Sequence, residues 1–294
     1  PLGVIHEFQK LGKNVPGMDA LITSDVPLGS GLSSSAAFEV ATACLLLELS
    51  GESMPRLDLA RLCQRAENQF VGVNCGLMDQ AASACCKSGH AMLLDCATPA
   101  CSWRPMPDAA VVVAHCGVRR GLSASAYNER RSQCEESLRI INQKTGRNYP
   151  NLCGVPVDLL PDLPRYLDDI HLRRTRHVIG ETDRVQKAID FFQKGKNAEA
   201  GEVLNQSHSS LRDDYEVSCT ELDELTEICR GFDGVYGSRL TGAGFGGCTV
   251  TLADPEKAEN LVNYLKEKYY RARNLDPVVF VTRAADGAGT VEED

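Results

Sequence analysis

A run of glycines and serines at residues 27–35 constrains the fold of this chain more than any other feature. It reads Pro-Leu-Gly-Ser-Gly-Leu-Ser-Ser-Ser and lies directly before a long apolar stretch. Glycine permits left-handed or crowded backbone, and the first turn of a helix leaves its N–H groups without partners inside the helix. Such amides, together with the positive end of the helix dipole, bind phosphate. With an alternating stretch at residues 18–26 before it, the run predicts a strand, an anion-binding loop and a helix in that order.

Two other loop types are excluded by the same residues. A Walker-type loop has a lysine beside its Ser or Thr, but no lysine lies between Pro27 and Glu48. A hydrolase nucleophile elbow has a glycine two positions after its serine, but Ser35 stands at that spacing from Ser33. A simpler interpretation, a serine-rich N-cap on a buried helix, stays open at this point.

The composition indicates two globular lobes without a nucleic-acid surface. The chain has 294 residues, 43% of them hydrophobic, which is enough for two cores. Its net charge of −9 argues against a general basic surface. The cysteine count, 13, is odd and includes no C-x-x-C pair, so we interpret the cysteines as small buried side chains in a reducing compartment. Because no signal peptide or membrane-length apolar run is evident, we expect a soluble, cytoplasmic protein.

Hydrophobic periodicity predicts alternating helices and strands along the chain. Helices are expected at residues 33–49, 57–70, 75–89, 172–211 with a turn near Gly195, and 255–273. Strands are expected at 18–26, 91–94, 109–114, 235–240, 249–252 and 278–281. Residues 143–164 carry four prolines and are expected to form a surface excursion between helices.

Two carboxylates lie where a functional role is plausible from the pattern. Glu67 flanks the apolar stripe of the helix at 57–70, where we expect partial burial, although a glutamate at such a position is more often solvated. Asp79 lies near the start of the next helix, where carboxylates more often cap the helix or complement its dipole. Neither residue is assigned a role by its position alone.

A second glycine-rich run, at residues 242–247, matches the pattern G-x-G-x-x-G. The dinucleotide fingerprint requires a helix after it, but a β-branched strand is expected here, so that interpretation is excluded. The run is expected to let backbone come close to a ligand or to the neighbouring lobe. Its glycines are Gly242, Gly244, Gly246 and Gly247.

Three separated segments, at residues 27–39, 75–80 and 241–248, together resemble the second and third motifs and the catalytic-aspartate segment of the galactokinase family. This family belongs to the GHMP superfamily of small-molecule kinases. The resemblance is narrowed to galactokinases by residues 74–80, 127–131 with 133–135, and 207–208 followed by 211–216. It covers nearly the whole chain, from about Val4 to Gly287.

The resemblance implies an α/β (α+β) protein with the two-lobed GHMP kinase fold. A mixed-sheet N-terminal lobe is expected at residues 1–105 and a ferredoxin-like C-terminal lobe at 106–294. The implied reaction is transfer of the γ-phosphoryl group of ATP to the C1 hydroxyl of galactose with Mg²⁺. Galactose and ATP are the partners that it implies, with no nucleic acid or membrane, and we expect a monomer.

The family's site residues carry over position by position. Ser35 and Glu67 match the hydroxyl and carboxylate that hold Mg²⁺, and Asp79 matches the catalytic carboxylate beside the C1 hydroxyl. Gly76 and Tyr127 match sugar-contacting positions together with Asp79, although Tyr127 by itself would be an ordinary half-buried aromatic. These roles agree with the chemistry, because hard cations prefer oxygen ligands and a carboxylate can orient the attacking hydroxyl. The loop implied to wrap the ATP phosphates consists of Gly29, Ser30, Gly31, Leu32, Ser33, Ser34 and Ser35.

One family signature, Arg-x-Asn-x-Ile-Gly-Glu-His-x-Asp-Tyr, does not occur in these residues. In the family it supplies an arginine near the catalytic carboxylate, sugar-binding side chains and the first strands of the N-terminal lobe. We therefore expect a fragment of a longer protein, with those first strands missing, an unpaired sheet edge and little sugar kinase activity by itself.

Two alternative functions are kept. An N-acetylgalactosamine kinase is disfavoured by Cys75-Gly76 and Tyr127, because the corresponding places in that relative make room for the acetamide. A non-catalytic sugar and ATP sensor is disfavoured by the intact Ser35-Ala36-Ala37, because sensors of that type can lose the residues after the serine run.

Overall fold

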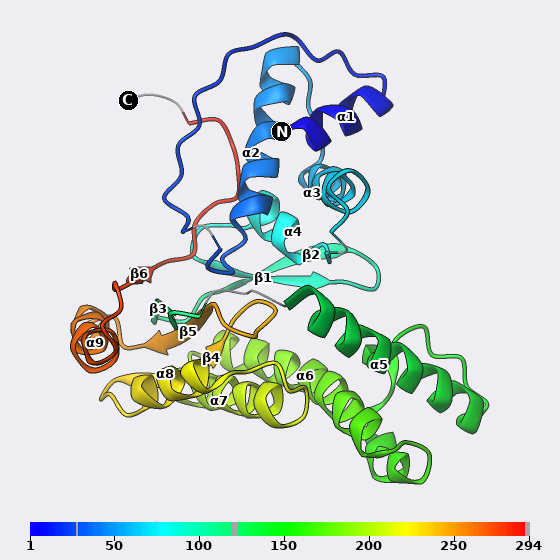
Figure 1. Cartoon of the computed structure of the whole chain (residues 1–294), viewed down its shortest axis with the longest axis vertical. Helices are drawn as coiled ribbons and strands as arrows, with labels where there is room; N and C mark the ends of the chain where they lie inside the picture. Colours follow the sequence, from blue (N-terminus) through cyan, green and yellow to red (C-terminus); the bar gives the residue numbers. More distant parts are fainter. Residues whose placement is uncertain (28, 74, 119–122, 292–294) are drawn as a thin grey trace. The chain divides into compact units, whose positions relative to one another are not determined.

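The described residues form helices and two β-sheets (Figure 1). The computed structural model describes residues 1–27, 29–73, 75–118 and 123–291. Contacts between Cα atoms divide the chain into two compact units, Pro1–Leu28 with Leu32–Met106 and Arg283–Asp294, and Gly29–Gly31 with Pro107–Thr282. Residues 29–31 belong to the second unit, whereas they are expected in the N-terminal lobe. Residues 283–294 belong to the first unit, whereas they are expected in the C-terminal lobe. The lobe boundary at 105–106 itself stays a prediction.

Helices form most of the first unit. They are α1 (Leu2–Lys10), α2 (Ser34–Ser50), α3 (Arg56–Arg65), a π-helix (Ala66–Val71) and α4 (Met78–Cys85). The strands β1 (His90–Asp95) and β2 (Ala100–Pro105) pair as an antiparallel hairpin, with His90 opposite Pro105. In the described part of this unit the sheet is this antiparallel pair, where the family resemblance implies a mixed sheet.

One apolar core holds the helices of the first unit together. Phe8 of α1, Leu46 of α2, and Leu59 and Leu62 of α3 are almost fully buried in it. Burying an aliphatic or aromatic side chain of this size contributes about 1.5–3 kcal/mol. This core fixes α2 and α3 against each other, which positions the side chains at their ends.

A returning segment after residue 282 is tied to the end of α4. The Gly287 N–H donates to the Cys86 carbonyl and the Ala288 N–H donates to the Ser83 carbonyl, both at 2.7 Å. Ala288 also packs against the core of the first unit. Residues far apart in the sequence therefore complete one unit.

Residues 18–26 are not a strand, contrary to the sequence prediction. Within the described ranges no strand ladder includes them, and Leu21 and Ile22 are 94% and 56% exposed. A strand is stable only where its N–H and C=O groups pair with a neighbour. Alternating hydrophobicity without a partner strand gives an extended segment here instead.

The second unit consists of a four-stranded antiparallel sheet in the order β4-β5-β3-β6, with helices packed on it. No helix in the described ranges is both long and apolar enough to span a bilayer. The strands are β3 (Ala110–His115), β4 (Val235–Leu240), β5 (Cys248–Ala253) and β6 (Val279–Thr282). The α-helices are α5 (Ser123–Thr145), α6 (Asp169–Gln193), α7 (Asn197–Asp213), α8 (Thr220–Arg230) and α9 (Ala258–Leu265), which continues into a π-helix (Lys266–Arg271).

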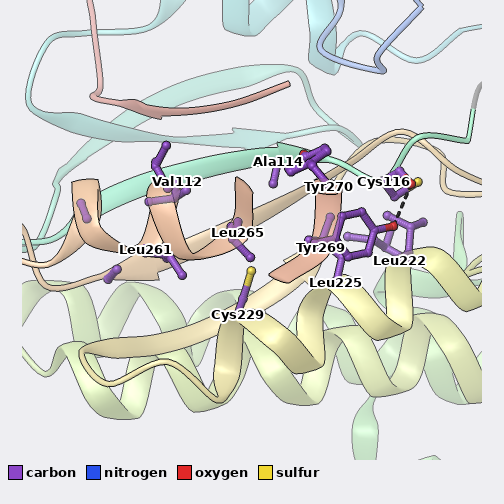
Figure 2. Close-up of a cluster of buried hydrophobic side chains, with 14 of the residues drawn as sticks. Val112, Ala114, Cys116, Leu222, Leu225, Cys229, Leu261, Leu265, Tyr269 and Tyr270 are labelled. Atoms are coloured by element: carbon purple, nitrogen blue, oxygen red, sulfur yellow. Dashed lines mark hydrogen bonds between the residues drawn. The ribbon is translucent and has the colours of Figure 1, made fainter. Parts of the chain in front are cut away.

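Side chains from β3, α8 and α9 form the core of the second unit, as Figure 2 shows. Val112, Leu225 and Leu265 are fully buried there. The Tyr269 hydroxyl donates to the Cys116 carbonyl at 2.8 Å, which satisfies a buried acceptor just after β3 ends.

Helix α7 lies directly against the backbone of β4. A Cβ atom on Gly201 would lie 2.1 Å from the Tyr236 carbonyl oxygen, and one on Gly237 would lie 2.0 Å from the Gly201 carbonyl oxygen. This approach requires glycine at both positions, since any larger side chain would overlap the opposite backbone.

Residues 143–164 are mostly exposed and connect α5 to α6, as the sequence predicts, but part of the segment is regular and packs inward. They contain two 3-10 helices, Leu152–Gly154 and Val157–Arg165. Leu152, Val155 and Leu163 are buried in a separate small core with residues of α5 and α6. Proline interrupts α-helical hydrogen bonding, but it is tolerated in short turns whose apolar side chains still pack inward.

Candidate functional site

The start of α2 has the features of an anion-binding terminus. Ser33, its N-cap residue, adopts a left-handed conformation with φ 60° and makes no side-chain cap hydrogen bond. The first turn of α2 contains no acidic residue. Gly29 and Gly31 also have positive φ, 70° and 80°. A helix that starts without a side-chain cap and without negative charge retains the amides and dipole that favour phosphate.

The two residues expected to hold a metal ion face each other. Ser35 lies in the first turn of α2 and Glu67 in the π-helix after α3, and the Ser35 hydroxyl donates to Glu67 Oε1 at 3.4 Å. The sequence pattern predicts an α-helix through Glu67, whereas the observed turn is wider. Single π-helical turns occur often at functional sites, because they redirect one side chain without ending the helix.

The other oxygen of Glu67 belongs to a buried hydrogen-bond cluster that sequence reasoning missed. Gln80 Nε2 donates to Glu67 Oε2 at 2.7 Å and to Glu39 Oε2 at 3.2 Å. Cys75 Sγ lies 3.4 Å from the same Glu67 oxygen. Glu39 is one helical turn after Ser35 in an otherwise apolar stretch, which is the signal that could have found it.

Burial changes the protonation of two members of this cluster. It raises the pKa of Glu39 to about 7, opposed by the hydrogen bond from Gln80 and helped by the nearby Glu67 carboxylate. It also raises the pKa of the Cys75 thiol to about 12, with Glu67 acting in the same direction. Cys75 is therefore a neutral thiol at physiological pH, and its single S–H is within hydrogen-bond reach of both Glu67 Oε2 and Asn68 Oδ1.

Asp79 lies in the first turn of α4, directly before Gln80, and is partly exposed. The positive end of a helix dipole favours a carboxylate at this position. The residues just before it, Gly76 to Met78, line an open cleft of about 500 Å³ in the first unit. The other residues of the cleft are Arg61, Gln64, Arg65, Cys96 and Pro99. The roles predicted for Asp79 and Gly76 are compatible with these positions and stay predictions.

Tyr127 belongs to the second unit. It lies in α5 and is 38% exposed. Asp79 and Gly76 belong to the first unit, so the sugar-contacting role of Tyr127 stays a prediction. Asn74, part of the segment that carries the resemblance, lies outside the described residues.

The glycine-rich run approaches backbone of its own unit. The Phe245 N–H donates to the Val217 carbonyl at 2.7 Å and the Gly247 N–H donates to the Val118 carbonyl at 3.0 Å. A Cβ atom on Gly244 would lie 2.1 Å from the Val217 oxygen. All four predicted glycines have positive φ, and β5 follows them as expected, which supports the exclusion of a dinucleotide fingerprint.

The oxygen donors present fit a magnesium ion that is shared with a phosphate. Among the described residues, no group of three or more His, Cys, Asp or Glu side chains could hold a metal ion alone. Mg²⁺ is commonly bound through one or two protein oxygens, with substrate phosphates and waters completing its shell. Ser35 and Glu67 supply two such oxygens beside the start of α2.

Comparison with known proteins gives consistent matches. Models of the GHMP kinases N terminal domain and the GHMP kinases C terminal domain match residues 1–87 and 188–271. Galactokinase of Fusobacterium nucleatum is 38% identical over 296 residues, covering 99% of this chain and 76% of that protein. Human galactokinase is 41% identical over 276 residues, covering 93% and 68%. The crystal structure of Lactococcus lactis galactokinase complexed with galactose has 32% identity and a TM-score of 0.87, covering 97% of this chain and 74% of that one.

Proposed function

The chain belongs to the galactokinase family of GHMP kinases, and on this basis we propose that the natural protein that contains it transfers the γ-phosphoryl group of ATP to the C1 hydroxyl of galactose. The observation that carries the proposal is the Ser35–Glu67 contact beside the start of α2, where Ser33 provides no side-chain cap. A kinase has to hold phosphate oxygens and a cation at one place, and this arrangement provides donors for both.

We propose that the loop at residues 29–35 holds the ATP phosphates through its amides and that Ser35 and Glu67 hold Mg²⁺. When bound, the cation would neutralise charge that develops on the phosphate oxygens. The support is the left-handed Ser33, the absence of acidic residues in the first turn of α2, and the 3.4 Å contact between Ser35 and Glu67.

Asp79 is proposed to orient the C1 hydroxyl or to accept its proton, with Gly76 and Tyr127 contacting the sugar. The hydroxyl oxygen forms a bond to the γ-phosphorus, the bond between that phosphorus and the β,γ-bridging oxygen breaks, and the proton passes to Asp79. The products are galactose 1-phosphate and ADP. The support is the partial exposure of Asp79 at a helix start and the cleft that begins at Gly76.

We further propose a monomer that acts in the cytoplasm, without nucleic-acid or membrane partners. Among the described residues, Cys63, Cys116 and Cys229 form no disulfide bond, which fits a reducing compartment. The net charge of −9 disfavours nucleic acid.

The test is galactose-dependent ADP release by the natural protein that contains this chain, with the product identified by ³¹P NMR. We expect galactose 1-phosphate, and a much lower rate with N-acetylgalactosamine. A higher rate with the acetylated sugar would favour the alternative kinase. ATP and galactose binding without turnover would favour the sensor.

A further inference from the structure

Gln80 is a fully buried amide that touches two carboxylates from different elements. It lies in α4, while Glu39 belongs to α2 and Glu67 to the π-helix. Its Nε2 atom donates to Glu67 Oε2 at 2.7 Å and to Glu39 Oε2 at 3.2 Å. An NH₂ group has two hydrogens, so one amide can serve both oxygens at once.

The orientation of this amide is determined by the carboxylates. An ionised carboxylate only accepts hydrogen bonds, so turning the amide over would place Gln80 Oε1 against Glu67 Oε2, an acceptor against an acceptor. In the observed orientation Gln80 Oε1 is buried without a hydrogen-bond partner among the described residues. A buried acceptor without a partner is unfavourable. The two hydrogen bonds to Glu39 and Glu67 therefore offset the cost of leaving Gln80 Oε1 without a partner.

This hydrogen bonding determines the direction of the second carboxylate oxygen of Glu67, Oε1. Gln80 holds Glu67 Oε2, with the Cys75 sulfur 3.4 Å from the same oxygen, and Oε1 is directed toward Ser35. The same amide lies between Glu67 and Glu39, two acidic groups that would otherwise repel each other when both are charged. Groups that hydrogen-bond to a metal ligand fix its direction, and their loss commonly lowers metal affinity 10- to 100-fold.

We propose that Gln80 is a positioning residue for the divalent cation that accompanies the nucleotide, acting through Glu67. This role rests on the proposed function, since it requires Ser35 and Glu67 to be the metal-holding pair. Gln80 itself touches neither cation nor nucleotide. Its role is to keep one oxygen of Glu67 occupied and the other available.

The test compares ADP binding in Mg²⁺ and in EDTA by titration calorimetry. The variant Gln80→Met keeps the side-chain length and removes both donors. Mg²⁺ should tighten ADP binding roughly tenfold less in this variant, so the dissociation constant in EDTA divided by that in Mg²⁺ should fall roughly tenfold. The dissociation constant in EDTA should change less than about twofold. The matched control is Gln206→Met, which removes an amide-to-carboxylate bond to Glu202 in the second unit and should leave the ratio unchanged.

Each outcome separates the two claims. If Mg²⁺ does not tighten ADP binding in the unsubstituted protein, the proposed metal site fails and the role of Gln80 with it. If Mg²⁺ tightens binding there and equally in Gln80→Met, only the role of Gln80 is overturned. Equal losses in Mg²⁺ and in EDTA also overturn it, because they indicate a general structural effect. Should Gln80→Met fail to fold, Gln80→Asn, which is too short to reach both carboxylates, takes its place with the same expected direction.

Discussion

Asp79 and Gln80 are neighbours in α4 that face different surroundings. Successive residues of an α-helix point about 100° apart. Gln80 is therefore directed into the buried cluster with Glu39 and Glu67, whereas Asp79 remains partly exposed. One helical turn can in this way serve both the hydroxyl proposed to react and the carboxylate proposed to hold the cation.

The first prediction concerns Asp79. Asp79→Asn keeps the size of the side chain but removes the carboxylate, so kcat for galactose phosphorylation should fall about 10²- to 10⁴-fold. Binding of ADP should be unchanged, because the nucleotide contacts are proposed to lie in the loop at 29–35. Asp58→Asn, an exposed aspartate of α3, is the control and should retain full turnover. An Asp79→Asn protein with ordinary kcat would remove this residue from the mechanism.

At the scale of elements, hydrophobic periodicity predicts the bounds of a helix or strand well when the burial of that element alone sets its pattern. Strand β4 is predicted and observed at Val235–Leu240, and α2 differs from its prediction by one residue at each end. Strand β2 (Ala100–Pro105) was missed, since half of its residues are polar or proline and its stability comes from pairing with β1. Residues 18–26 show the converse, an alternating pattern without a ladder in the described structure.

The residues of the candidate site also differ in how far the sequence alone reveals them. The loop is indicated by its own glycines and serines, whereas the roles predicted for Glu67 and Asp79 come from the resemblance to the galactokinase family. Glu39 has one sequence signal, a charged residue in an otherwise apolar stretch, and Gln80 has none. Their shared role becomes visible only when α2, α4 and the π-helix bring them together. The π-helical turn at Glu67 is likewise set by packing and has no sequence signature.

The second prediction concerns the glycine-rich run as an element. Gly244→Ala adds a Cβ atom at φ 80°, 2.1 Å from the Val217 carbonyl oxygen, so both strain and overlap oppose it. We expect a loss of roughly 1–3 kcal/mol in the free energy of unfolding, measured by urea denaturation. Gly146→Ala has a similar φ of 67° but nothing within 4 Å of the added atom, and should cost less. Equal losses in the two variants would mean that the contact with Val217 contributes nothing.

At the scale of the whole molecule, stability should depend on buried neutral histidines. His208 is fully buried, and its Nδ1 accepts from the Leu240 N–H at 3.2 Å, so Nε2 carries the proton and donates to Asp223. Burial lowers the pKa of His208 to about 4, and that of His177 to about 4 as well. This network ties α7 to α8 and β4.

The third prediction follows from the sign of these shifts. Between pH 6.5 and about 4 the unfolded chain binds protons at His208 that the folded chain does not, so the free energy of unfolding should fall as pH falls through this window. The slope is at most about 1.4 kcal/mol per pH unit for each such histidine. His208→Gln should reduce the slope in urea titrations from pH 7.5 to about 4.5. The exposed His6→Gln should not, and an unchanged slope in His208→Gln would contradict the assignment.

The bonds from Gly287 and Ala288 to the end of α4 also bear on the order in which the molecule is made. A ribosome releases residues 1–106 long before residue 288, so the first unit waits through the synthesis of the entire second unit for its closing contacts. The earlier-made portion leaves the tunnel first but receives these contacts only after residue 288 has been made.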